Sequence, residues 1–173
     1  HTDRSKENVS PGGTRRETLK ATPIDGVPYH WATEDQAIEG SGEMNRDPEK
    51  VERGLKAHAE IQNLVAQWVI DNGLEPRSPS SRVANYDLAW FDDQDIFHVC
   101  EVKSLTAGNE EHQLRIGLGQ VLRYRQKCGH GTIAVLAIER APTDNSWLAL
   151  CEELNVKVVW RGHLDPLQGG NLK

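Results

Sequence analysis

Apolar residues recur at helical spacing over residues 48–72. They are Val51, Leu55, Ile61, Leu64, Val65, Trp68 and Val69, and the positions between them are largely charged or polar. Asp47 and Pro48 precede this stripe and Gly73 follows it. An apolar stripe with a capping Asp, a Pro in the first turn and a terminal Gly predicts one long amphipathic helix.

The following residues alternate between apolar and polar, as strands do. We expect a short edge strand at 74–77 and two longer strands at 83–91 and 96–103. Residues 92–95, with the sequence DDQD, separate the two longer strands. A polar turn between two alternating runs predicts a β-hairpin.

Helix and strand signals then alternate to the end of the pattern. We expect a helix at 110–127 that stops at Gly129, a strand at 132–138, a helix at 144–154 and a strand at 156–160. The run at 132–138 is continuously apolar, which is typical of a strand buried on both faces. The order α-β-β-β-α-β-α-β predicts a mixed α/β fold, in which helices flank a mixed central sheet.

The domain organisation follows from where this periodicity begins and ends. Residues 1–46 are rich in Gly, Pro, Ser and charge, so we expect a flexible leader with one packed segment around Tyr29 and Trp31. The folded domain is expected at 47–165, and a short tail at 166–173. Because the sequence does not begin with Met, we expect a piece of a longer protein with further domains; the alternative is a tag remnant at His1.

The composition narrows the class of protein. Hydrophobic residues make up 37% of the chain and charged residues 27%, and no run approaches the roughly 18 apolar residues of a membrane span. The N-terminus is polar, unlike a signal peptide. The three cysteines are odd in number and widely spaced, which favours a reducing compartment. We therefore expect a cytoplasmic protein without a membrane partner.

The charge of the chain is unevenly distributed. The net charge is -6, but residues 103–127 carry five cations and only two acids. Arg115, Arg123 and Arg125 lie on the helix expected there. They are candidates for contacts to a nucleic-acid backbone. The alternative is an ordinary solvated helix face.

The hairpin carries the candidate chemistry. Its turn is centred near Gln94, so Asp87, seven residues before, falls opposite Glu101, seven residues after. Glu101 and Lys103 share one face of their strand, because side chains alternate. Two opposed carboxylates repel each other unless a cation compensates, and Mg²⁺ prefers such oxygen ligands. The alternative is a strand whose charges simply face water.

Here the sequence resembles a known family. Asp87, thirteen intervening residues and then Glu101-Val102-Lys103 are similar to the D…(D/E)XK signature of the PD-(D/E)XK, or restriction-endonuclease-like, superfamily. The αβββαβ core of that family has the element order expected over about residues 48–160. The resemblance therefore covers most of the periodic part of the chain.

The resemblance implies an activity. It implies a Mg²⁺-dependent deoxyribonuclease, with Mn²⁺ able to substitute, in which Asp87 and Glu101 hold the metal and Lys103 is catalytic. The family's Pro before the Asp is replaced here by Asn85-Tyr86.

A second motif lies on the next helix. Gln120 and Tyr124 are four residues apart on one helical face and resemble the QxxxY motif of exonuclease-like branches of this superfamily. There the pair supports the site or contacts DNA, so Gln120 becomes a catalytic candidate near Lys103 and Tyr124 a DNA-binding one. The alternative is a Tyr packed against the core.

The first helix offers a weaker candidate. Many members of the family carry an acidic residue on this helix that reaches the metal, and Glu60 lies on its polar side. The alternative is a solvated Glu paired with Lys56. His58, His98 and His112 are expected to be structural or exposed, because a metal-activated water requires no histidine base.

We expect DNA as the partner and an endonuclease of the restriction or defence type, or the catalytic domain of one. A repair or recombination nuclease is one alternative. A nucleic-acid-binding domain that kept the fold and lost catalysis is the other. A homodimer, the strandedness of the substrate and the choice between DNA and RNA stay open.

Overall fold

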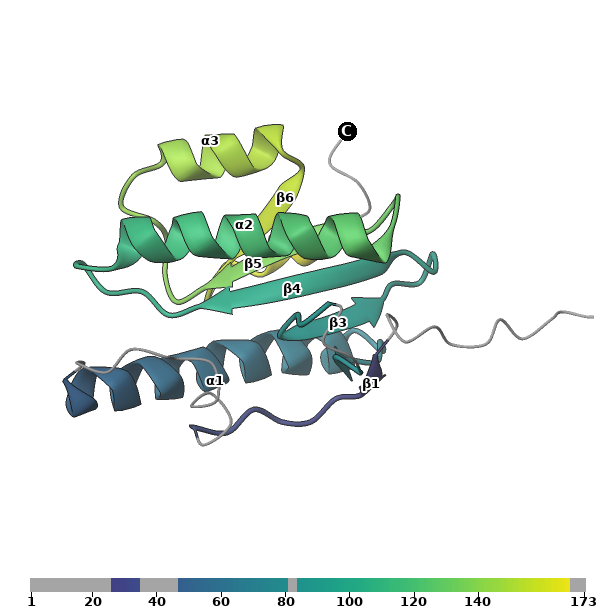
Figure 1. The fold of residues 1–173 in the computed structure, drawn as a ribbon. Coiled ribbons are helices and arrows are strands. Elements are labelled where there is room, and N and C mark those ends of the chain that lie inside the picture. The colour runs from purple at the N-terminus through teal and green to yellow at the C-terminus, as the bar shows by residue number, and fades with distance from the viewer. Residues whose placement is uncertain (1–25, 35–46, 81–83, 169–173) are drawn as a thin grey trace, which may run out of the picture.

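The computed structural model describes residues 26–34, 47–80 and 84–168 (Figure 1). The strands are β1 (Val27–Pro28), β2 (Arg77–Ser78), β3 (Leu88–Phe91), β4 (Phe97–Lys103), β5 (Ile133–Ile138) and β6 (Val156–Val159). The helices are α1 (Pro48–Asp71), α2 (Glu110–Cys128), α3 (Ser146–Glu153) and the short 3-10 helix η2 (Asp165–Leu167). From α1 to β6 the order is the predicted one, and the mixed α/β class is confirmed.

One six-stranded sheet forms the centre of the described part of the chain. Its strands lie in sequence order; β1 to β4 pair antiparallel, and β4, β5 and β6 pair parallel. Parallel neighbours need crossover connections, and α2 and α3 provide them. Both helices cover one face of the sheet and α1 covers the other (Figure 1).

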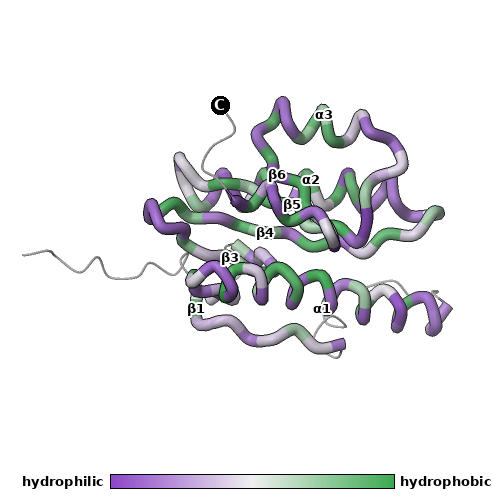
Figure 2. The backbone as a smooth tube through the Cα atoms, turned by 180° about the vertical axis from the view of Figure 1, so that it is seen from behind, coloured by the Kyte–Doolittle hydropathy of each residue, from purple (hydrophilic) through white to green (hydrophobic). Residues whose placement is uncertain are grey.

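Each face of the sheet has its own hydrophobic cluster. Along β4, Val99 belongs to the cluster between the sheet and α2, whereas Cys100 and Val102 belong to the cluster between the sheet and α1. Because side chains alternate along a strand, Glu101 and Lys103 lie on the α2 face. The first turns of α1 are mostly hydrophilic and its later turns carry the hydrophobic residues (Figure 2).

The predicted ends of both long helices are confirmed. The side chain of Asp47 accepts a hydrogen bond from the N–H of Glu49 at 3.2 Å, and Pro48 opens α1. Gly73 follows α1 with φ +76° and Gly129 follows α2 with φ +105°, a backbone region that favours glycine. None of the helices in the described residues is long and apolar enough to cross a membrane.

The strands before the hairpin are shorter than expected. Arg77–Ser78 replaces the edge strand expected at 74–77, and β3 begins at Leu88 instead of 83. Where the ladder ends, the side chain of Asp87 takes the place of a backbone partner: its Oδ2 accepts the N–H of Val102 at 2.6 Å. Residues 81–83 lie outside the described part of the chain.

Parts of the expected leader and tail pack onto the domain. Val27 pairs with Ser78, and Leu167 is buried in the cluster between the sheet and α1. Gly26 has φ +82°, and a Cβ there would lie 2.4 Å from the carbonyl oxygen of Ser78 and 2.6 Å from Oη of Tyr86. Only glycine fits this position, so the turn into β1 is held against the residue that precedes Asp87.

Candidate active site

Asp87 is fixed at the point where β3 meets β4. Leu88 and Cys100 form the last pair of the ladder, so Asp87 lies one residue beyond it, beside the stretch of β4 that contains Glu101. The N–H of Asp87 donates to the carbonyl of Cys100 at 3.0 Å, and its carboxylate accepts from Val102. Backbone groups on the partner strand therefore fix the direction of this carboxylate.

Glu101 is a buried acid beside a second acid. Its residue is only 3% exposed, and its Oε1 lies 2.5 Å from Nζ of Lys103. Burial, and then the charge of Asp87, raise the pKa of Glu101 to about 8, although the Lys103 ammonium lowers it. The structure thus brings Asp87, Glu101 and Lys103 together, and their charges are best balanced when the pair of acids holds a proton or a cation.

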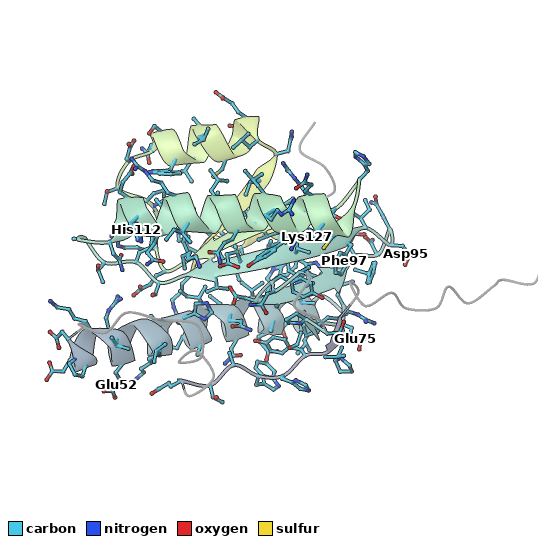
Figure 3. The ribbon with its side chains drawn as sticks, in the orientation of Figure 1. Glu52, Glu75, Asp95, Phe97, His112 and Lys127 are labelled. Atoms are coloured by element: carbon cyan, nitrogen blue, oxygen red, sulfur yellow. The ribbon has the colours of Figure 1, made fainter. Side chains whose placement is uncertain are left out.

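Lys103 lies beneath α2 and depends on a glycine there. A Cβ on Gly117 would lie 2.9 Å from Cγ of Lys103 and 2.8 Å from Cδ1 of Leu136. Glycine therefore lets the helix approach the sheet closely enough to cover the lysine stem. Figure 3 labels Phe97 and Asp95 at the hairpin end of β4, from which the strand runs beneath α2 towards Lys103.

Tyr124 and Gln120 extend the site onto α2. Nε2 of Gln120 lies 3.5 Å from Oη of Tyr124. Burial, and then the charges of Glu101 and Asp87, raise the pKa of Tyr124. Oε1 of Gln120 is buried and has no hydrogen-bond partner among the described residues. Lys103 pairs with Glu101 instead of Gln120, so Gln120 reaches the acids through the tyrosine.

His58 is a residue of the site that sequence reasoning missed. Its Nε2 lies 3.4 Å from Oδ2 of Asp87, and Nε2 of Gln62 donates to the carbonyl of Asp87 at 2.9 Å. The two side chains are four residues apart, so they share one face of α1. Their polar spacing beside the apolar stripe was the available signal, but only the packing of α1 on the hairpin shows what they contact.

Glu60 is not brought to this site. It lies 3.7 Å from Arg161, and neither Asp87 nor Lys56 is its partner. Two residues correspond to about 200° around a helix, so Glu60 and His58 lie on nearly opposite sides of α1. The position that reaches the hairpin from this helix is therefore His58.

Two of the three candidate arginines, Arg115 and Arg125, make contacts on the side of α2 that faces α3. Nε of Arg115 donates to Glu111 at 2.8 Å, and the same carboxylate accepts from the indole of Trp147 in α3 at 3.0 Å. Arg125 donates to the carbonyl of Leu154 at 2.8 Å, just after α3. These guanidinium groups help to hold α2 and α3 together.

Arg123 lies elsewhere on the helix. Its guanidinium donates to the side chain of Gln126, one turn further along α2. It follows Gln120 by three residues, which sets it about 60° away from Gln120 around the helix axis. Arg115 is about 140° from Gln120 by the same measure. Of the three arginines, Arg123 is therefore the one on the flank of the candidate site.

The residues of the site fit a magnesium ion better than a metal with many protein ligands. Among the described residues, no group of three or more His, Cys, Asp or Glu is arranged to hold a metal ion. Mg²⁺ usually needs only one or two carboxylates and completes its shell with water and substrate phosphates. Asp87 and Glu101 supply such a pair, and because burial and then the charge of Asp87 raise the pKa of Glu101, a cation would stabilise the ionised pair.

No protein-family model matches the chain, and no curated protein matches it. The residues of the site itself are therefore the basis for inferring a function.

Proposed function

We propose that this chain is a metal-dependent nuclease that hydrolyses phosphodiester bonds of DNA. We take it to be an endonuclease of the restriction or defence type, or the catalytic domain of one. The observation that carries the proposal is the buried carboxyl of Glu101, which lies beside Asp87 and 2.5 Å from the Lys103 ammonium at the end of a hairpin. A buried acid with a strongly raised pKa and specific charged neighbours is typical of a functional site.

Asp87 and Glu101 would hold Mg²⁺, or Mn²⁺ in its place. When bound, the ion supplies Lewis-acid chemistry to a phosphate and a water molecule. Glu101 would have to lose its proton to hold the ion, so metal binding would depend on deprotonation of this acid. The N–H of Val102 orients the carboxylate of Asp87 before any ligand arrives.

Lys103 provides the cation that the reaction needs. Its ammonium can donate to a phosphate oxygen as negative charge develops there, or orient the attacking water. Burial below Gly117 limits the rotamers of its stem, so the ammonium stays near the acids. The hydroxyl of Tyr124 beside Glu101, supported by Gln120, helps to fix the position of that carboxylate.

A cleavage assay tests the proposal. Purified wild-type protein with Mg²⁺ should cut DNA, whereas Glu101→Gln, Asp87→Asn and Lys103→Gln should lose about 100-fold or more of the rate. Asn keeps an acceptor for the N–H of Val102, so Asp87→Asn removes charge without opening the hairpin. Glu111→Gln, a change at an exposed acid of α2, is the matched control. Wild-type rates in Glu101→Gln would end the proposal.

Metal binding is a separate readout. Titration with Mn²⁺ should show binding to the wild type, Glu111→Gln and Lys103→Gln, but not to Asp87→Asn or Glu101→Gln. A domain that binds DNA without cleaving it would fail the cleavage assay in the wild type itself.

A repair or recombination nuclease is the second candidate. The contact between Gln120 and Tyr124, next to the acids, favours it, because the resemblance to exonuclease-like branches depends on this pair. Closed circular DNA separates the two candidates. An endonuclease cuts circles and linear molecules, whereas an enzyme that needs ends degrades only linear DNA.

A further inference from the structure

The segment at residues 26–34 is fixed to the domain at several points. The N–H of His30 donates to Oγ of Ser78 at 3.0 Å. The N–H of Ala32 donates to Oδ1 of Asn63 at 2.9 Å, and Nδ2 of Asn63 returns a bond to the carbonyl of Ala32 at 3.0 Å. The backbone on both sides of Trp31 is therefore held in place.

Trp31 itself remains exposed. At 49% exposure it is the most exposed large hydrophobic residue in the described part of the chain. Its ring packs edge-to-face with Tyr29, at 5.5 Å between centroids and 78° between planes. The hydroxyl of Tyr29 donates to Asn63 at 2.9 Å. A tryptophan that is held by these contacts and yet is half exposed contributes less to the core than its size allows.

The same segment lies beside the candidate active site. Gln62, the neighbour of Asn63 on α1, donates to the carbonyl of Asp87 at 2.9 Å. At its start, Gly26 is pressed against Tyr86, the residue before Asp87. The segment that carries Trp31 is therefore joined to Asp87 through neighbouring residues of α1, Asn63 and Gln62, and through Tyr86.

Exposed aromatic rings near a phosphodiesterase site have a natural ligand. Nucleobases stack on Trp, Tyr and Phe without regard to sequence, because every base has a π face. In a duplex the faces of the bases are already stacked, so such a platform favours unpaired nucleotides. Because the backbone around Trp31 is fixed before binding, stacking there costs little ordering of the protein.

We propose that Trp31 is a stacking platform for an unpaired base of the DNA strand bound at the Asp87, Glu101 and Lys103 site. The inference rests on the proposed function for the identity of the ligand. It makes single-stranded DNA, or duplex DNA with unpaired nucleotides, the preferred substrate class.

Equilibrium binding of labelled oligonucleotides, followed by fluorescence anisotropy in EDTA, tests the platform without cleavage. Trp31→Leu should weaken binding of single-stranded DNA by about 5- to 150-fold, the effect of losing one stacked base. Trp31→Phe should keep most of the affinity, since it keeps a ring. Trp147→Leu, a change in α3, is the matched control. The salt dependence should not change, because no charge is removed.

Two further ligands make the test specific for a base. An oligonucleotide of abasic sites, with the same phosphates, should bind the wild type and Trp31→Leu equally. A fully paired duplex should lose little affinity in Trp31→Leu. Equal affinity of both proteins for single-stranded DNA, or an equal loss on duplex and abasic DNA, would overturn the proposal. Melting temperatures of the variants establish that each is folded.

Failure of this inference is distinguishable from failure of the proposed function. Binding that depends on Trp31, with no cleavage in Mg²⁺ by the wild type, would support the platform and reject the nuclease. Cleavage by the wild type with unchanged binding in Trp31→Leu would reject the platform and leave the nuclease standing.

Discussion

Replacing Glu101 with Gln should stabilise the metal-free protein, and by more at pH 8 than at pH 5. The reason is the burial of this acid beside Asp87, which raises its pKa from 4.5 to about 8. At pH 7 an unfolded Glu is ionised, whereas the folded protein must keep Glu101 protonated. The unfolded pKa of 4.5 lies well below pH 7 and the folded pKa lies above it, so keeping the proton costs at most about 3 kcal/mol of stability at pH 7.

The sign of the pH dependence follows from proton counts. Below pH 4.5 the carboxyl is neutral in both states, so its contribution to stability is fully present. Between pH 4.5 and about 8 the unfolded chain releases the proton and the folded chain keeps it, so the free energy of unfolding falls as pH rises. Gln has no proton to lose. The difference between the variant and the wild type therefore grows across this window and levels off above it.

Urea unfolding in EDTA at pH 5, 6, 7 and 8, followed by tryptophan fluorescence, measures this difference. Glu111→Gln is the matched control, because Glu111 is exposed and pairs with Arg115 at the surface. The change of its stability with pH should run parallel to that of the wild type. Mg²⁺ should raise the stability of the wild type and not of Glu101→Gln, since a cation favours the ionised pair. Parallel curves for the wild type and Glu101→Gln from pH 5 to pH 8 would refute the reasoning.

Three further predictions concern α2. Arg123→Gln should lower the slope of log K against log salt for DNA binding by about one unit, whereas Arg115→Gln should not; equal slopes would move the DNA surface elsewhere. Gln120→Ala should slow cleavage by about 10- to 1000-fold with a stability change below about 1 kcal/mol, and Tyr124→Phe should have a smaller effect on rate. Normal turnover in Gln120→Ala would reduce the pair to packing. Gly117→Ala should cost about 1–3 kcal/mol of stability, measured by urea unfolding, because its Cβ would lie 2.8 Å from Leu136; a neutral effect would show that the helix can shift away.

The features that the sequence predicted well have local causes. The cap of α1, the glycine stops and the continuous apolar strand β5 are each encoded within a few neighbouring residues. The pairing of the hairpin is also local, because the turn at residues 92–95 fixes the register. Counting outward from that turn was enough to bring Asp87 and Glu101 together. This is why the central part of the candidate site could be read from the sequence.

The features that the sequence missed depend on contacts between distant elements. No local pattern shows that His58, rather than Glu60, reaches Asp87, because the rotation of α1 on the hairpin decides it. In the sequence Arg125 is as suitable for a phosphate contact as Arg123. In the structure its guanidinium donates to the carbonyl of Leu154. Charge and spacing identify candidates, and the packing of α2 against α3 decides between them.

The early end of β3 connects the fold to the proposed chemistry. If β3 continued from Leu88 back to residue 83, its backbone would pair with the last residues of β4. The N–H of Val102 would then donate to a backbone carbonyl and not to a side chain. Because the ladder ends instead, the N–H of Val102 needs another acceptor, and the carboxylate of Asp87 provides it at 2.6 Å. The hydrogen bond that satisfies the strand thus also holds one acid against the other. The missing stretch of strand is therefore part of how the candidate site is built.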